Sequence, residues 1–322
     1  MLLAAGRPLD GLALCREAID KDPGSSRLRE KSLAILFGLG RDDELYVAAS
    51  KLLADNPGSP AAHVQLAGMF LRKGLPTLAS DHCNKALAGQ PGSEGAYRLL
   101  VAALLQTGDI EAARERLERL LAVLPQDLDA TIKLAECHRR RGDTAKALEL
   151  LRKGVADHPA SPAARSQLAQ VLFQTGDGKG AVAEFRETYR LAPNDPTALN
   201  NLAAVISYGD GDLSEALGYA EQARKLDPRN PTILDTLAWI QTRLGKHEPA
   251  LALSELALAQ QPNLPILRYH YGAILAALGR QDEVRDALKA AMRGGADFQG
   301  VADARALLER LSGAAPLAPA AP

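Results

Sequence analysis

The sequence predicts an all-α protein built as a solenoid of paired helices, and three observations carry this prediction. A proline recurs every 34 residues, with one interval of 35, at positions 23, 57, 91, 125, 159, 193, 228 and 262. A glycine stands 17 residues before each of these prolines, from Gly6 to Gly245. No stretch shows the alternation of apolar and polar residues that indicates a strand. Each period therefore fits two helices with a glycine between them and a proline at the end.

The repeat from Asn230 to Pro262 shows the pattern most clearly. Asn230 can cap a helix that begins at Pro231, where the missing N–H of proline costs nothing. Apolar residues then recur at helical spacing until Gly245 ends the helix. The second helix carries small residues at i, i+4 and i+7, on which a neighbouring helix can pack closely: Ala250, Ser254 and Ala257.

The same pattern predicts the other elements in chain order. An unpaired second helix is expected over 7–21, and the first complete pair over Ser25–Leu39 and Asp42–Ala54. Further pairs are expected at 60–88, 93–122, 127–156, 161–190, 195–226, 230–260 and 264–293. Pro8, Pro76 and Pro249 are expected in the turns within pairs. Because a solenoid grows by stacking, we expect one continuous array.

Residues 1–296 resemble the tetratricopeptide repeat (TPR) family. The resemblance lies in a Leu-Ala pair in the first helices and in small residues at two positions of the second helices. These residues include Leu66-Ala67, Leu134-Ala135, Leu168-Ala169, Leu202-Ala203 and Leu237-Ala238, then Ala79, Ala113, Ala147, Ala181, Ala216 and Ala250, and Ala86, Ala223 and Ala257. The resemblance implies a right-handed superhelical α-solenoid whose concave wall is lined by the first helices.

Both ends of the chain depart from the repeat. Residues 1–23 form a partial first repeat, so we expect a chain that continues a longer array, with an exposed apolar face that permits self-association. An amphipathic capping helix is expected over 297–312. The Pro/Ala tail over 313–322 is expected to be disordered, because it has little to bury.

Composition and motifs argue against several functions. The net charge of −1 gives no field that would attract nucleic acid, and no apolar run is long enough for direct membrane insertion. The three cysteines form no CxxC pair, and the six histidines are scattered. We therefore expect no enzyme activity, no cofactor and no metal site.

The candidate site is a peptide-binding groove on the concave wall that the resemblance implies. Polar and aromatic residues concentrate on the first helices of three successive repeats: Asn200, Asn201, Tyr208, Asp235, Trp239, Arg243, Tyr269 and His270. Trp and Tyr are common anchors of interfaces. In the alternative interpretation, Trp239 and Tyr269 only fill space between helices.

A narrower resemblance covers residues 195–311. Asn200-Asn-Leu-Ala, Asp235-Thr-Leu-Ala-Trp and Ile266-Leu-Arg-Tyr-His, followed by Ala304–Leu311, are similar to the C-terminal repeats of TPR lipoproteins of the exosortase/PEP-CTERM sorting system and of polysaccharide-export scaffolds. The resemblance implies a bacterial scaffold that binds protein segments in an envelope assembly, periplasmic or anchored through an upstream part. The alternatives are a cytoplasmic location, and a TPR arm of a larger enzyme such as a glycosyltransferase.

Overall fold

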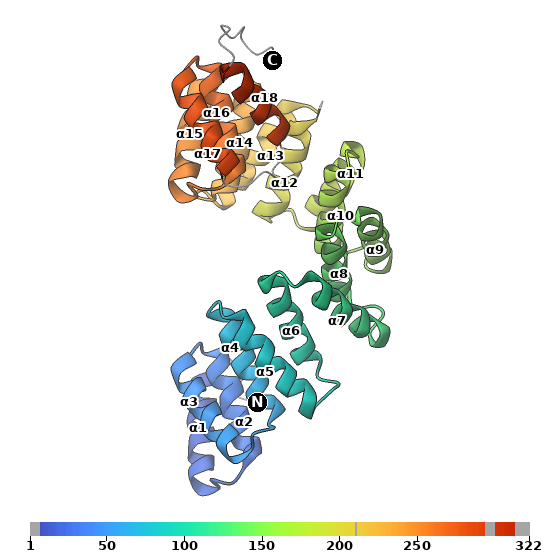
Figure 1. Ribbon diagram of the computed structural model, residues 1–322, viewed down its shortest axis with the longest axis vertical. Coiled ribbons are helices and arrows are strands. Elements are labelled where there is room, and N and C mark those ends of the chain that lie inside the picture. The colour runs from blue at the N-terminus through green and yellow to red at the C-terminus, as the bar shows by residue number, and fades with distance from the viewer. Residues whose placement is uncertain (1–6, 210, 294–299, 313–322) are drawn as a thin grey trace. The chain divides into compact units, whose positions relative to one another are not determined.

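The structure is a computed structural model, and it describes residues 7–209, 211–293 and 300–312. This part of the chain contains eighteen α-helices and no strand. The chain divides into two compact units, residues 1–150 and 151–322. Figure 1 shows that the helices stack in pairs within each unit.

The first unit begins with an unpaired helix, α1 (Pro8–Lys21), as the sequence predicts. The helices that follow it are α2 (Ser26–Gly38), α3 (Asp42–Asp55), α4 (Pro60–Arg72), α5 (Pro76–Gly89), α6 (Glu94–Thr107), α7 (Ile110–Val123) and α8 (Leu128–Arg140). The boundary between the units falls within α9 (Thr144–Asp157).

The second unit continues with four pairs and a last helix. The pairs are α10 (Pro162–Gln174) with α11 (Gly178–Leu191), α12 (Pro196–Tyr208) with α13 (Leu213–Leu226), α14 (Pro231–Arg243) with α15 (His247–Gln260), and α16 (Pro265–Ala277) with α17 (Gln281–Arg293). Helix α18 (Val301–Ser312) packs on α17, at the place expected for the capping helix. The predicted tail and residues 1–6 lie outside the described residues.

The repeated glycines and caps explain where the helices stop and start. Seven glycines of the 34-residue register have a positive φ, the conformation that lets the chain leave the first helix of a pair: Gly40, Gly74, Gly108, Gly142, Gly176, Gly245 and Gly279. The Asn230 side chain caps α14, as predicted, by accepting a hydrogen bond from the Thr232 N–H at 3.0 Å.

The prediction for three prolines was wrong. Pro8, Pro76 and Pro249 do not lie in the turns but in the first turn of α1, α5 and α15. The N–H groups of the first helical turn have no partner within the helix, so a proline can be accommodated there. Helix α15 therefore begins at His247, three residues before Ala250, where the sequence pattern placed its start.

Small residues of the second helices form much of the core. Ala79, Ala113, Ala147, Ala216 and Ala250 are fully buried. Cys83 is also fully buried, and burial raises the pKa of its thiol to about 12, as expected for a packing residue. The predicted ridge of small residues is thus the surface on which neighbouring helices meet.

Candidate functional site

The eight predicted site residues lie on three first helices of the second unit. Asn200, Asn201 and Tyr208 belong to α12. The other two helices supply Asp235, Trp239 and Arg243 from α14, and Tyr269 and His270 from α16. Five of the eight residues contact one another in one cluster, which we call the α12–α16 cluster: Tyr208, Asp235, Trp239, Tyr269 and His270.

A chain of two hydrogen bonds runs through the α12–α16 cluster. The Oδ2 of Asp235 lies 2.7 Å from Nδ1 of His270, and Nε2 of His270 lies 2.7 Å from the hydroxyl oxygen of Tyr208. A carboxylate accepts hydrogen bonds, so His270 donates through Nδ1 and, in its neutral form, accepts from Tyr208 through Nε2. Burial raises the pKa of Tyr208, and the nearby Asp235 raises it further, so the hydroxyl keeps its proton.

Aromatic rings fill the space around this chain. Trp239 stacks on His270 with ring centroids 4.4 Å apart. Trp239 also stacks on Tyr208, with ring centroids 5.7 Å apart. Phe173 of α10 packs against Tyr208 at 5.8 Å. The rings therefore join the first helices of four successive repeats.

Half of the predicted groove residues are less accessible than a ligand-binding wall requires. The exposed fractions are 4% for Asn200, 5% for Asp235, 6% for Tyr269 and 2% for His270. Asn201, Tyr208 and Trp239 are half-buried, and Arg243 is exposed. The alternative that these rings fill space between helices thus describes part of the cluster. That it binds a peptide stays a prediction.

Two further features of this wall are the hydrogen bonds of Arg243 and three buried polar atoms that have no partner among the described residues. Arg243 donates to the carbonyl oxygens of Ser207 and, at 2.9 Å, Gly209, so its guanidinium holds the end of α12. Three buried polar atoms of the cluster region make no hydrogen bond among the described residues: Asn200 Oδ1, Asp235 Oδ1 and Trp239 Nε1. Such atoms are uncommon in folded proteins and are the ones that a water molecule or a ligand group would satisfy.

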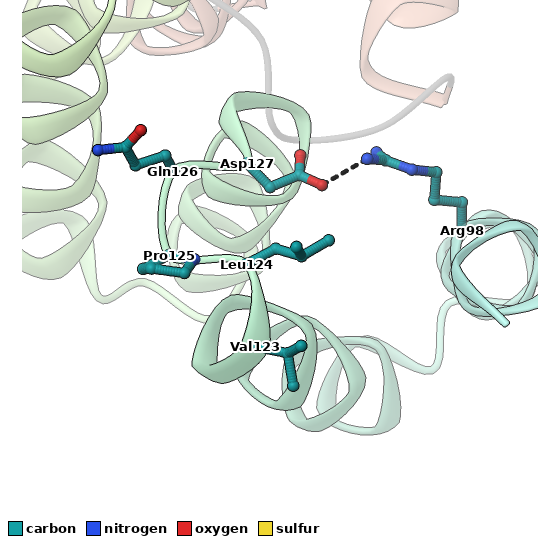
Figure 2. Close-up of a pocket in the computed structure, with 6 residues that line it drawn as sticks. All are labelled: Arg98, Val123, Leu124, Pro125, Gln126 and Asp127. Atoms are coloured by element: carbon teal, nitrogen blue, oxygen red, sulfur yellow. Dashed lines mark hydrogen bonds and ion pairs between the residues drawn. The ribbon is translucent and has the colours of Figure 1, made fainter. Parts of the chain in front are cut away.

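A separate hollow in the first unit has a volume of about 520 Å³ (Figure 2). It lies between Arg98 of α6 and the segment 123–127. Arg98 points at Asp127 in Figure 2, and it also donates hydrogen bonds to Asp129 at 3.0 Å and to Glu94 at 2.7 Å. The hydrogen bonds that Arg98 donates to Glu94 and Asp127 raise the pKa of Arg98. The charge of Arg98 is thus matched by its own neighbours, and we interpret it as a structural tie.

A third region was not predicted from the sequence. It is a groove of about 660 Å³ in the first unit, which we call the α3–α5 groove. It is lined by side chains of three consecutive helices and of the turn between the last two: Asp43, Tyr46, Val47, Ser50 and Leu53 of α3, Leu66, Met69 and Phe70 of α4, Lys73 and Leu75 of the turn, and Leu78 and His82 of α5. The available signal was two adjacent large apolar residues, Tyr46 and Val47, on a second helix. One of them must face outward, and both prove to be exposed.

Among the described residues, no group of three or more His, Cys, Asp or Glu side chains is arranged to hold a metal ion. No described helix combines the length and apolar character needed to cross a bilayer.

The comparisons with known proteins identify the family. Two family models, both described as Tetratricopeptide repeat, match the chain, one at residues 99–162 and 201–265 and the other at 138–206. Together the matches run without a gap from 99 to 265, more than half of the chain. The chain therefore belongs to the tetratricopeptide repeat family.

Solved structures support the fold. A tetratricopeptide repeat protein from Parabacteroides merdae ATCC 43184 is 17% identical, with a TM-score of 0.63, and the match covers 79% of this chain and 99% of that one. The APC/C hetero-tetramer Cut9-Hcn1 contains a chain that is 16% identical, with a TM-score of 0.52, over 94% of this chain and 52% of that one. No curated protein matches the sequence significantly.

Proposed function

We propose that this protein is a non-enzymatic scaffold that binds protein segments along the first helices of its second unit. The observation that carries the proposal is the half-buried surface at the edge of the α12–α16 cluster, where Asn201 and Tyr208 of α12 and Trp239 of α14 lie on two consecutive repeats. Stacked repeats present such side chains at regular intervals, which suits an extended ligand. Trp and Tyr supply large contact areas at a low cost in conformational entropy.

The unpaired atoms of the wall suggest how a segment is held. Asn200 and Asp235 each have an acceptor oxygen without a hydrogen bond among the described residues, and Trp239 has an unpaired N–H donor. A peptide backbone offers both a donor and an acceptor at each residue, so it can satisfy all three when the half-buried rings of Tyr208 and Trp239 move aside. Recognition through the backbone would tolerate many sequences, as a scaffold requires.

We further propose that the assembly belongs to a bacterial envelope, as part of exopolysaccharide export or PEP-CTERM protein sorting. This step is supported by the resemblance of residues 195–311 to the repeats of such proteins. That a tetratricopeptide fold works inside a complex has a parallel in the Cut9-Hcn1 hetero-tetramer. Cell fractionation of the full-length protein tests the location, and recovery in the cytoplasm alone would contradict it.

Site-specific photo-crosslinking in cells tests the scaffold itself. A photoreactive amino acid is placed at Asn201, on the wall, or at Leu256, a residue of α15 that is 53% exposed. We expect crosslinks to one or more defined proteins from position 201 and few from position 256. Equal labelling from both positions, or none from position 201, would contradict binding at this wall.

A further inference from the structure

We propose that the α3–α5 groove of the first unit binds a partner segment by enclosing one tryptophan side chain, whose indole N–H donates a hydrogen bond to His82. This inference rests on the proposed scaffold function but concerns a different surface. The second unit and its α12–α16 cluster take no part in it.

The groove has the size and lining of a ligand site. Its volume of about 660 Å³ lies within the range of pockets that enclose small ligands or large side chains. Four of the eleven exposed large apolar side chains in the described part of the chain lie along it: Tyr46, Val47, Leu75 and Leu78. Exposed apolar side chains that gather in one place mark interaction surfaces more often than scattered ones do.

Aromatic rings form one wall of the groove. The ring of Phe70 stacks on His82, with centroids 5.4 Å apart, and meets the edge of Tyr46 at 6.4 Å. An indole ring can pack against such a wall by stacking or edge contacts.

The hydrogen bonds behind His82 fix which of its nitrogens carries a proton. His63 is 4% exposed, and its Nε2 lies 3.0 Å from the carbonyl oxygen of Pro57, which can only accept, so Nε2 of His63 carries the hydrogen. Burial lowers the pKa of His63. Burial, and the repulsion that a protonated His63 would exert, lower the pKa of His82 to about 4, so both rings are neutral near pH 7.

The proton positions then follow along the pair. Nδ1 of neutral His63 has a lone pair, and it lies 2.9 Å from Nδ1 of His82. His82 must therefore donate through Nδ1, which leaves its Nε2 as an acceptor. His82 lines the groove, and Nε2 has no hydrogen-bond partner among the described residues. His82 therefore offers the groove an acceptor nitrogen that cannot donate, whereas the hydroxyls of Tyr46 and Ser50 in the same lining can do both.

Charge and donor chemistry select tryptophan among the residues that could enter. The two charged residues of the lining, Asp43 and Lys73, lie 3.6 Å apart and offset each other, so the groove favours a neutral group. Phenylalanine and leucine would cover Nε2 of His82 without a donor, which costs binding energy. The indole is large and apolar, and its N–H donates without accepting.

Selection from a displayed library of random peptides against the intact protein tests the proposal. We expect the selected peptides to share a tryptophan. Their affinity should fall at least tenfold for Val47→Asp and for Leu78→Asp, both exposed positions where aspartate need not disturb the fold. The control is Leu256→Asp, an exposed leucine of the second unit, for which we expect no change.

The hydrogen bond is tested without altering the protein. Replacing the tryptophan of a selected peptide by benzothienylalanine, which has sulfur in place of the N–H, should weaken binding about fivefold to tenfold. Selected peptides that lack tryptophan, or that bind Val47→Asp and Leu78→Asp as well as the unchanged protein, would overturn the proposal, and so would a selection that yields no peptide. Peptides that lose affinity with Trp239→Phe and not with Val47→Asp would overturn it while supporting the proposed function.

Discussion

At the scale of single residues, the hydroxyl of Tyr208 donates a hydrogen bond to Nε2 of the buried His270. Tyr208→Phe keeps the ring stack with Trp239 but leaves Nε2 of His270 without its 2.7 Å partner. An unpaired buried acceptor costs about 1–3 kcal/mol, so we expect the second unit to lose stability by about that much. Trp239 is the only tryptophan in the sequence, so its fluorescence during urea unfolding reports on this unit.

Tyr189 provides the control for this prediction. Its ring packs edge-on against Tyr219 at 5.3 Å, and its hydroxyl has no hydrogen bond among the described residues. Tyr189→Phe should therefore leave the unfolding midpoint nearly unchanged. If both variants shift the midpoint equally, the hydrogen bond to His270 is not the source of the effect.

The paired histidines of the first unit predict a dependence of stability on pH. The pKa of His82 falls from 6.5 to about 4 on folding, and that of His63 is also lowered, so the unfolded chain binds more protons in this range. The contribution of the two neutral histidines to the free energy of unfolding is therefore fully present above about pH 6.5 and is lost as the pH falls towards 4. The nearby Lys85 favours the neutral form of His82, and Asp81 opposes it.

Urea unfolding followed by circular dichroism at pH 7 and pH 5 measures this effect. We expect a lower midpoint at pH 5, and a smaller difference between the two pH values in His82→Phe, which removes one of the two groups. An unchanged difference in His82→Phe would assign the pH dependence to other groups.

From the sequence, the five residues of the α12–α16 cluster could be placed on the first helices of three successive repeats, but their interactions could not be predicted. The repeat places Asn200 and Asp235 at equivalent positions of neighbouring first helices, so their proximity follows from the period. The hydrogen bond between Tyr208 and His270 links two residues that are 62 positions apart and belong to repeats that are not neighbours. It depends on the angle between helices and on side-chain rotamers, which the period does not determine.

At the scale of elements, the turn after α6 allows a test of the register glycines. Gly108 follows α6 with φ of 80°, and a methyl group added there would meet nothing within 4 Å. Gly108→Ala should therefore destabilise the protein by about 1–2 kcal/mol through backbone strain alone.

Gly95, in the first turn of the same helix, is the matched control. It also has open space around its Cα, but its backbone is helical, so alanine loses less conformational entropy on folding. Gly95→Ala should stabilise the protein by about 0.4–1 kcal/mol. Thermal unfolding followed by circular dichroism distinguishes the two, and a shift of the same sign in both variants would contradict this account of the turn.

The elements themselves were largely predictable, because the period, the turn glycines and the caps agree with one another. The α3–α5 groove was not predictable to the same degree. Its walls come from three helices, and the sequence alone does not show which apolar residues remain exposed after the helices pack. Tyr46 and Leu78, for example, occupy helical positions that could equally have faced a neighbour.

At the scale of the whole molecule, the α12–α16 cluster departs from the usual rule for repeat proteins. A solenoid repeat normally contacts only its neighbours, so an array can unfold one repeat at a time. Here a side-chain hydrogen bond between Tyr208 and His270 links α12 directly to α16, past the repeat that contains α14. Trp239 of α14 stacks against both rings, with its centroid 5.7 Å from that of Tyr208 and 4.4 Å from that of His270, while those two rings lie 6.0 Å apart. We therefore expect these three repeats to open as one cooperative unit.

Native-state hydrogen exchange of the full chain measures this cooperativity. The slowest amides of α12, α14 and α16 should share one opening free energy, and Tyr208→Phe should lower it by a similar amount in all three helices, because each opening breaks the same cluster. Gly108→Ala lies in the first unit, far from the cluster in sequence, and should leave these amides unchanged. If Tyr208→Phe lowers protection in α12 alone, the bond between Tyr208 and His270 does not couple the repeats, and the array opens repeat by repeat.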